Sequence, residues 1–129
     1  MSTPEAGDEA RAPKTWDDIR AEVDSGEGVA TLWALSLRKA YGAGRLTLRI
    51  NGEISSELRA RGLGHVPSEI SDLPTDQWGW VRIYDATKPI GRIIEAAQRP
   101  GEQDDQRLRE GINGDAADIL KAVRALVAE

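Results

Sequence analysis

The segment GRLTLRINGEISSELRARGLGHVP, Gly44–Pro67, is the part of the sequence on which the fold prediction depends. Within it, apolar side chains recur at helical spacing at Ile50, Ile54 and Leu58. Because residues four apart lie on one face of a helix, this spacing predicts a helix over residues 47–61 that buries its aliphatic side.

The residues around this helix supply its expected ends and a preceding turn. Thr47 can cap its start, and Gly62 can follow Arg61 in a left-handed conformation. A second short helix is expected over Leu37–Tyr41, with Ser36 as its cap. Only a few residues, two of them glycines, separate the two helices. That spacing is typical of a helix-turn-helix unit.

Further elements are expected on both sides of this unit. Asp17 and Asp18 follow a Thr15 cap in a first helical turn, where carboxylates favour the positive end of the helix dipole. The expected elements are a helix from Thr15 to Gly26, a strand at Val29–Trp33, a hairpin of Leu63–Val66 with Trp78–Tyr84, a helix opening at Thr87 with Ile90, Ile93 and Ile94 as its buried stripe, and a helix over Asp115–Val127.

This order of elements resembles the winged helix-turn-helix family of DNA-binding domains. The residues that carry the resemblance are LSLRKAYGAGRLTLRINGEISSELRARGLGHVP (Leu35–Pro67) and QWGWVRIYD (Gln77–Asp85). We therefore expect an α+β, mostly helical fold: a winged helix of three helices and a β-hairpin, with added C-terminal helices. Expected regions are a disordered acidic tail (1–14), the winged-helix domain (15–85) and a helical extension (86–129) that packs on it or forms a dimer.

The charge of the chain is distributed unevenly. The net charge is −5, from 17 basic and 22 acidic side chains. Residues 29–66 nevertheless carry six basic and two acidic side chains, whereas residues 1–28 carry three and eight, and residues 67–129 carry eight and twelve. The only positive segment is therefore the one that contains the predicted helix-turn-helix, which indicates an anionic partner for that segment.

The outward side of the predicted third helix is small and cationic. At about 100° per residue, the side opposite the aliphatic stripe collects Arg45, Leu48, Gly52, Ser55, Ser56 and Arg59, with Arg49 and Glu53 on its flank. Glycine inside a helix costs about 1 kcal/mol relative to alanine, so its presence calls for a reason. Small residues between arginines would allow close approach to a phosphate backbone or groove.

The family resemblance implies that this helix is the recognition helix, which enters the major groove of DNA. Arg45 and Arg49 would then contact phosphates or bases, and Arg59 a guanine or phosphate. Asn51 would contact adenine if its side chain leans outward. With the wing included, the predicted DNA-binding residues are Arg45, Arg49, Asn51, Gly52, Ser55, Ser56, Arg59, His65 and Arg82.

Each of these features also has a purely structural interpretation. The arginines can form ion pairs along the helix, Gly52 and the serines can form a packing site, and His65 can be a hairpin residue with a satisfied hydrogen bond. Trp78 and Trp80 share a face of the hairpin, where packing is favoured over base stacking. The pairs at ion-pair spacing are Arg49 with Glu53 and Glu57 with Arg61.

Enzymatic and metal-dependent functions find little support in the sequence. There is no cysteine and only one histidine, which excludes disulfides, thiolate ligands and a histidine-rich metal site. YGAGR (Tyr41–Arg45) lacks the full phosphate-loop pattern, and Asp104 with Asp105 is expected to be a solvated pair. The sequence therefore predicts no catalysis, cofactor or metal. It also lacks a signal peptide or an apolar run of about 20 residues, so a cytoplasmic protein without a membrane partner is expected.

Two functions follow from these patterns. The first is a small DNA-binding protein, a transcriptional or chromosome-associated factor similar to small bacterial winged-helix modules. The second is a winged-helix module for protein–protein interaction or dimerisation without DNA binding. The acidic total charge favours the second, because DNA-binding domains of this size are usually basic. The C-terminal helices could pair in a homodimer, or the acidic part could cover the basic helix as a DNA mimic.

Overall fold

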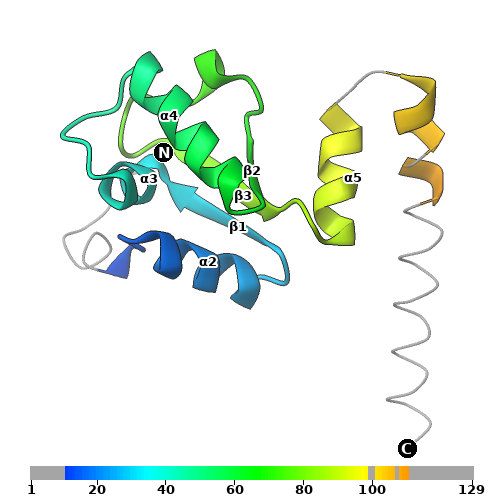
Figure 1. Ribbon diagram of the computed structural model, residues 1–129, viewed down its shortest axis with the longest axis horizontal. Helices are drawn as coiled ribbons and strands as arrows, with labels where there is room; N and C mark the ends of the chain where they lie inside the picture. The colour runs from blue at the N-terminus through cyan, green and yellow to red at the C-terminus, as the bar shows by residue number, and fades with distance from the viewer. Residues whose placement is uncertain (1–10, 99–100, 107, 111–129) are drawn as a thin grey trace, which may run out of the picture.

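Short strands are interspersed among the helices along the chain (Figure 1). The structure, a computed structural model, describes residues 11–98, 101–106 and 108–110. Its elements are α2 (Trp16–Ser25), β1 (Val29–Trp33), α3 (Ala34–Tyr41), α4 (Leu48–Ala60), β2 (Leu63–Val66), the 3₁₀ helix η1 (Ile70–Asp72), β3 (Trp80–Asp85) and α5 (Pro89–Gln98). The strands form one three-stranded antiparallel sheet. The predicted α+β class is confirmed, and the order of elements is compatible with the predicted winged-helix layout.

Threonine caps begin two helices where the sequence predicts them. The Thr15 hydroxyl accepts a hydrogen bond from the backbone N–H of Asp18 at 3.1 Å. Thr47 accepts one from the N–H of Ile50, also at 3.1 Å. After the end of α4, Gly62 adopts a left-handed conformation with a φ of 74°, which disfavours residues with a side chain. The predicted start and glycine stop of α4 are therefore confirmed.

Helix α3 begins earlier than the sequence predicts. The prediction that Ser36 caps it was wrong, because Ser36 is buried inside the helix, which starts at Ala34. The backbone N–H groups of Ala34 and Leu35 donate to the carbonyls of Gly79 and Gln77, at 2.8 Å each. These carbonyls from the segment before β3 satisfy the groups that a capping side chain would otherwise bind. The helix can therefore follow β1 directly.

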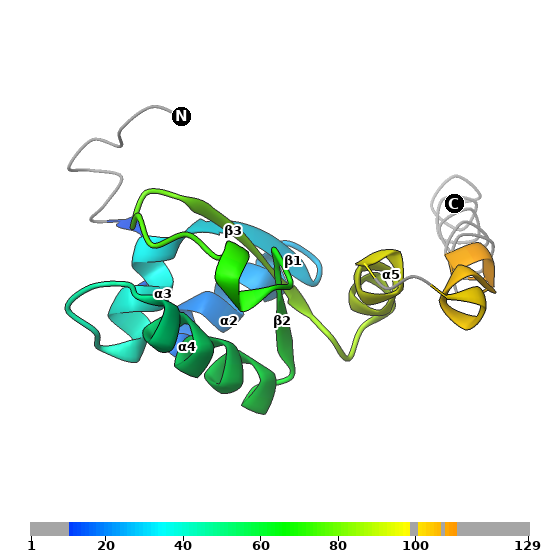
Figure 2. The ribbon, with the colours of Figure 1, turned by 90° about the horizontal axis from the view of Figure 1, so that it is seen from above.

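Three helices cover one face of the sheet. Its order is β1-β3-β2, so β3 is central and pairs with both neighbours. Figure 2 shows α2, α3 and α4 gathered against this sheet. The buried residues contributed by the strands are Leu32, Leu63, Val81 and Ile83, and those contributed by the helices are Ile19, Val23, Leu37, Ile54 and Leu58. The predicted hairpin is thus confirmed, although its second strand begins at Trp80 rather than Trp78.

The other face of the sheet carries a tryptophan cluster at one end. Trp33 and Trp80 are cross-strand partners whose rings stack with centroids 5.2 Å apart. Trp78 meets the Trp33 ring edge-on at 5.7 Å. Trp80 nonetheless remains 48% exposed. These contacts support the hairpin-packing interpretation of Trp78 and Trp80, because each ring has an aromatic neighbour from β1.

The connection between β2 and β3 folds back onto α4. Leu73 of this connection is buried in the core, and the Pro74 carbonyl accepts a hydrogen bond from Asn51 Nδ2 at 3.2 Å. Ile70, in η1, lies next to the middle of α4: a Cβ added at Gly52 would be 4.0 Å from its Cγ2 atom. One edge of α4 is therefore covered by irregular backbone.

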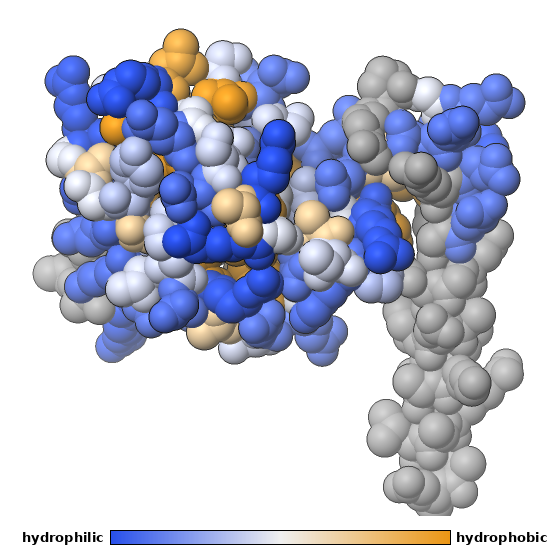
Figure 3. Space-filling view, viewed as in Figure 1, coloured by the Kyte–Doolittle hydropathy of each residue, from blue (hydrophilic) through white to orange (hydrophobic). Residues whose placement is uncertain are grey.

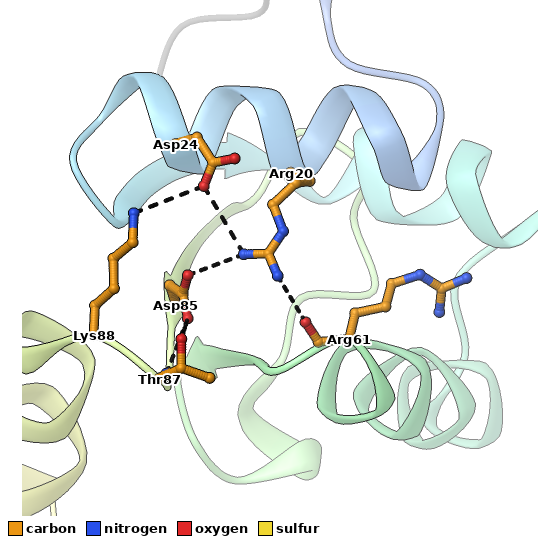
Figure 4. Close-up of polar contacts among 6 residues, drawn as sticks. All are labelled: Arg20, Asp24, Arg61, Asp85, Thr87 and Lys88. Atoms are coloured by element: carbon orange, nitrogen blue, oxygen red, sulfur yellow. Dashed lines mark hydrogen bonds and ion pairs between the residues drawn. The ribbon is translucent and has the colours of Figure 1, made fainter.

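A buried carboxylate lies where β3 ends (Figure 4). Asp85 Oδ1 accepts hydrogen bonds from the Thr87 hydroxyl at 2.6 Å and from its N–H at 2.9 Å. Asp85 Oδ2 accepts from Arg20 of α2 at 3.0 Å. The hydrogen bond from the Thr87 side chain is the main cause that lowers the pKa of Asp85, and the Arg20 charge adds to it. Asp85 therefore remains ionised and ties α2 to the turn before α5.

The same arginine reaches the end of α4. Arg20 Nη2 donates to the Arg61 carbonyl at 3.0 Å, which satisfies an acceptor just beyond the last turn of α4. Lys88, beside α5, lies 3.8 Å from Asp24 of α2. Figure 4 shows the side chains of Arg20, Asp24, Asp85 and Lys88 meeting beside the Arg61 carbonyl, whereas the Arg61 side chain points away from them. This junction fixes the beginning of α5 against the sheet.

Helix α5 packs with small residues rather than with its predicted isoleucine stripe. Gly91 and Ala96 are its buried residues, whereas Ile90, Ile93 and Ile94 are half-buried. A Cβ at Gly91 would lie 2.0 Å from the Asp85 carbonyl oxygen, so only glycine permits this approach. The predicted helix over 115–127 and most of the predicted tail, residues 1–10, lie outside the described residues.

Candidate nucleic-acid interface

The exposed side of α4 keeps the cationic character that the sequence predicts. Arg45, just before the helix, and Arg49, Ser56 and Arg59 within it are all exposed. Leu48, the first residue of α4, is 63% exposed. These positions follow one side of the helix, away from the core residues. The helix therefore presents a stripe of arginines separated by small side chains.

Two of the three arginines in this stripe have no acidic partner in the described part of the chain. Among the residues that the structure describes, neither Arg45 nor Arg59 forms an ion pair. Arg49 does pair with Glu53, at 3.0 Å, but its side chain is 76% exposed. Glu53 also accepts a hydrogen bond from the Tyr41 hydroxyl at 2.6 Å, which raises the pKa of Tyr41. Exposed pairs of this kind are weak and exchangeable.

The arginine at the end of α4 is used within the protein instead. Arg61 forms an ion pair with Glu57 at 2.6 Å. Its guanidinium also lies 4.7 Å from the centre of the Trp16 ring, a cation–π distance. The structural interpretation of this pair is therefore confirmed, and the free cationic stripe ends at Arg59.

Asn51 does not face outward. Its contact with adenine was conditional on an outward-leaning side chain, and that condition is wrong: Asn51 is only 4% exposed. Its amide donates to the Pro74 carbonyl at 3.2 Å. A buried backbone acceptor requires such a partner, so Asn51 holds the β2–β3 connection rather than a base.

Ser55 and His65 are likewise turned inward, against the prediction that they are available to DNA. Ser55 Oγ lies 2.7 Å from His65 Nε2, and His65 Nδ1 lies 2.6 Å from the Pro67 carbonyl oxygen. A carbonyl can only accept, so Nδ1 carries a proton, and in the neutral ring Nε2 accepts from the Ser55 hydroxyl. This confirms the interpretation of His65 as a hairpin residue with satisfied hydrogen bonds.

Gly52 and Ser56 remain at the surface, although Gly52 is bordered by Ile70. The Ser56 hydroxyl donates to the Gly52 carbonyl at 3.3 Å, a weak local bond within the helix. The packing interpretation of Gly52 therefore has support from its contact with η1, and its groove contact stays a prediction.

Arg82 is exposed but does not join the α4 stripe. It alternates along β3 with Val81 and Ile83, which are buried toward the helices. Successive side chains of a strand point to opposite faces, so Arg82 lies on the sheet face away from α4. It borders a cavity lined also by Ile90 and Ile94 of α5. The structure thus brings together Arg45, Arg49, Gly52, Ser56 and Arg59, but not Arg82.

The sequence interpretation missed the contribution of Ile70 to this surface. Ile70 lies in a connection rich in proline and polar residues, yet it is apolar and 37% exposed next to α4. Its only sequence signal is the pair of aliphatic residues, Ile70 and Leu73, in a connection otherwise made mostly of polar residues and prolines. Spacing alone could not show that one faces the core and the other the stripe.

Two further features, a metal-binding cluster and a membrane-spanning helix, are absent from the part of the chain described by the structure. That part contains no group of three or more histidine, cysteine, aspartate or glutamate side chains that could hold a metal ion. None of its helices is both long and apolar enough to cross a membrane.

Comparisons with known proteins add no assignment. No protein-family model matches the chain, and no curated protein or solved structure matches it. The winged-helix resemblance therefore stays a prediction, and function must be inferred from the geometry and charge of α4.

Proposed function

We propose that this protein is a small DNA-binding protein of the winged-helix type, with α4 as its recognition helix. The single observation that carries the proposal is the exposed stripe of Arg45, Arg49 and Arg59, in which two arginines have no carboxylate partner among the described residues. The helix-turn-helix arrangement of α3 and α4 and the sheet order β1-β3-β2 support it. A transcriptional or chromosome-associated role is the corresponding biological proposal.

The stripe suits a groove because its centre is narrow. Gly52 and Ser56 present little bulk between the arginines at its two ends, so the helix backbone can approach the duplex closely. Arg45 and Arg49 lie near the N-terminus of α4, where free N–H groups and the helix dipole also favour phosphate. Arg59 lies almost three turns further on and would reach the backbone beyond the groove.

The acidic total charge does not prevent this binding but limits it. The net negative charge resides outside residues 29–66, and screening at physiological salt reduces its effect beyond about 8 Å. Each phosphate contact adds to the dependence of affinity on salt. With about three arginine contacts, we expect weak binding that decreases steeply with salt.

Charge reversal on α4 tests the proposal. Binding of the full chain to random duplex DNA is measured between about 50 and 200 mM salt. The variant Arg45→Glu/Arg49→Glu should lose binding and its salt dependence. The matched control Arg92→Glu/Arg109→Glu makes the same charge change at exposed positions outside the stripe. It should retain most of the affinity for DNA and the same dependence of that affinity on salt. Equal losses in both variants, or no binding by the wild type at low salt, would contradict the proposal.

One observation favours the alternative of a protein-interaction module. Trp80 is 48% exposed on the sheet face away from α4, where it stacks on Trp33. Tryptophan is enriched at protein interfaces because it buries a large area. If the wild type does not bind DNA, Trp80→Ala should weaken self-association or partner binding, as measured by sedimentation.

A further inference from the structure

Two large apolar side chains are exposed within the arginine stripe. The large hydrophobic residues that are exposed in the described part of the chain are Leu48 (63%), Ile70 (37%) and Trp80 (48%). Trp80 has aromatic neighbours on the sheet, whereas Leu48 and Ile70 border α4. Figure 3 shows hydrophobic surface, in orange, near the start of α4 and η1 at the top of the molecule.

Leu48 and Ile70 lie on either side of Gly52. Leu48 is one helical turn before Gly52, on the same side of α4. Ile70 Cγ2 would be 4.0 Å from a Cβ at Gly52, so its side chain lies beside that glycine. The three residues form what we call the apolar ridge, which lies within the arginine stripe. Leu48 lies outside the core, and Ile70 is only partly covered.

The charge around the apolar ridge restricts what can cover it. Arg45 and Arg49 are exposed on either side of Leu48 in the chain. A suitable partner therefore combines regularly spaced anions with a small apolar group at the position of the ridge. In duplex DNA the apolar group in the major groove is the C5-methyl group of thymine, and it lies between two phosphate backbones.

We infer that Leu48, supported by Ile70, contacts thymine methyl groups and gives the protein a preference for A·T-containing sites. This inference rests on the proposed function, because it requires α4 to lie in the major groove. Leu48 is then a specificity-determining residue, and Arg45, Arg49 and Arg59 supply affinity that does not depend on sequence. Gly52 leaves the space into which the methyl group fits.

Replacing thymine by deoxyuridine in the DNA tests the inference without changing the protein. The probe is an alternating A·T duplex of about two helical turns, compared with the same duplex containing deoxyuridine, which lacks only the methyl groups. The wild type should bind the deoxyuridine duplex about fourfold more weakly for each methyl group that the ridge contacts. Leu48→Gln should bind both duplexes equally, and Leu48→Met should retain the preference. Ser56→Ala, in the same stripe but at a position without a large apolar side chain, should also retain it.

The outcomes separate this inference from the proposed function. Salt-dependent binding with equal affinity for the two duplexes would overturn the role of Leu48 but leave α4 as a DNA-binding helix. If Leu48→Gln weakened binding to both duplexes equally, Leu48 would contact something other than the methyl group, and the inference would again be wrong. Absence of binding to either duplex at low salt would refute both.

Discussion

Ser55 and Ser56 are neighbours in the sequence, yet one faces the interior of the protein and the other faces solvent. Ser55 is buried and bonded to His65, whereas Ser56 is exposed and donates only to the Gly52 carbonyl of its own helix. We call these the inner side and the outer side of α4. The inner side holds irregular backbone and a strand in place through polar contacts. The outer side carries three arginines, two of which have no acidic partner in the described part of the chain.

This difference shows that small polar residues do not by themselves mark a binding surface on a helix. Asn51 and Ser55 are polar because they face carbonyl and imidazole groups of the protein, which must be hydrogen-bonded when buried. The outer side is distinguished by charge at Arg45 and Arg59 that no described carboxylate neutralises. If this division is correct, substitutions on the inner side reduce stability and those on the outer side reduce binding.

The largest expected effect is that of a core residue on the inner side. Leu58 has no exposed surface, and Leu58→Ala should lower the free energy of unfolding by about 2–5 kcal/mol. Arg59→Ala, at the next position but on the outer side, should change it by less than about 0.5 kcal/mol. Urea unfolding of the two variants checks the prediction. If both variants lost a similar amount of stability, the outer side of α4 would not be free of structural contacts.

The second-largest expected loss of stability is caused by a substitution of Asp85, the buried carboxylate at the end of β3. The folded-state pKa of Asp85 is lowered by the Thr87 hydrogen bonds and Arg20, so its ionised form stabilises the fold above its unfolded pKa of about 4. That contribution is lost as the pH falls below about 4 through the folded-state pKa. Asp85→Asn should lower the free energy of unfolding by about 1.5–3 kcal/mol at neutral pH. Its stability should also depend less on pH in the acid range than that of the wild type. Thermal unfolding from neutral to acidic pH measures both.

In this acid titration, Glu53→Gln is the control, because its exposed pair with Arg49 should contribute little. A wild-type profile that Asp85→Asn does not alter would mean that other carboxylates determine acid unfolding. The Arg20 contact at the end of β3 would then be of minor importance for stability.

A smaller effect distinguishes the two serines. Ser55→Ala leaves the His65 Nε2 atom buried without its donor, so a loss of about 1–2 kcal/mol is expected. Ser56→Ala removes only a weak local bond at an exposed helical position, and should be neutral or slightly stabilising because alanine is the better helix former. Denaturant midpoints of the two variants give the comparison. It would be contradicted if Ser56→Ala were the more harmful substitution.

Local signals allowed much of the fold to be predicted. The caps at Thr15 and Thr47, the glycine stop at Gly62 and the hairpin depend on residues close together in the chain, and the structure agrees. The start of α3 could not be predicted, because carbonyls from Gln77 and Gly79, about 40 residues further along, replace its cap.

The candidate site was only partly predictable for the same reason. A helical wheel identifies the core stripe of α4 but not what covers its edges. It cannot show that Asn51 and Ser55 are buried, because the chain that covers them, from His65 to Pro74, folds back over a distance that periodicity does not describe. The arginines of the outer side were identified correctly as exposed, since charged side chains without buried partners remain in solvent.

The last expected effect, a small gain in stability, links the two sides of α4 at Gly52. A Cβ there would meet nothing closer than Ile70 Cγ2 at 4.0 Å, an ordinary contact, so Gly52→Ala should stabilise the fold by about 0.5–1 kcal/mol. If glycine were retained only for packing, that substitution would leave DNA binding unchanged. If the outer side enters a groove, the added methyl group should weaken DNA binding while raising the urea midpoint. Measuring DNA affinity and the urea midpoint on this one variant therefore decides whether Gly52 serves packing or binding. A glycine that lowers stability relative to alanine is needed only if the surface that contains it binds a partner.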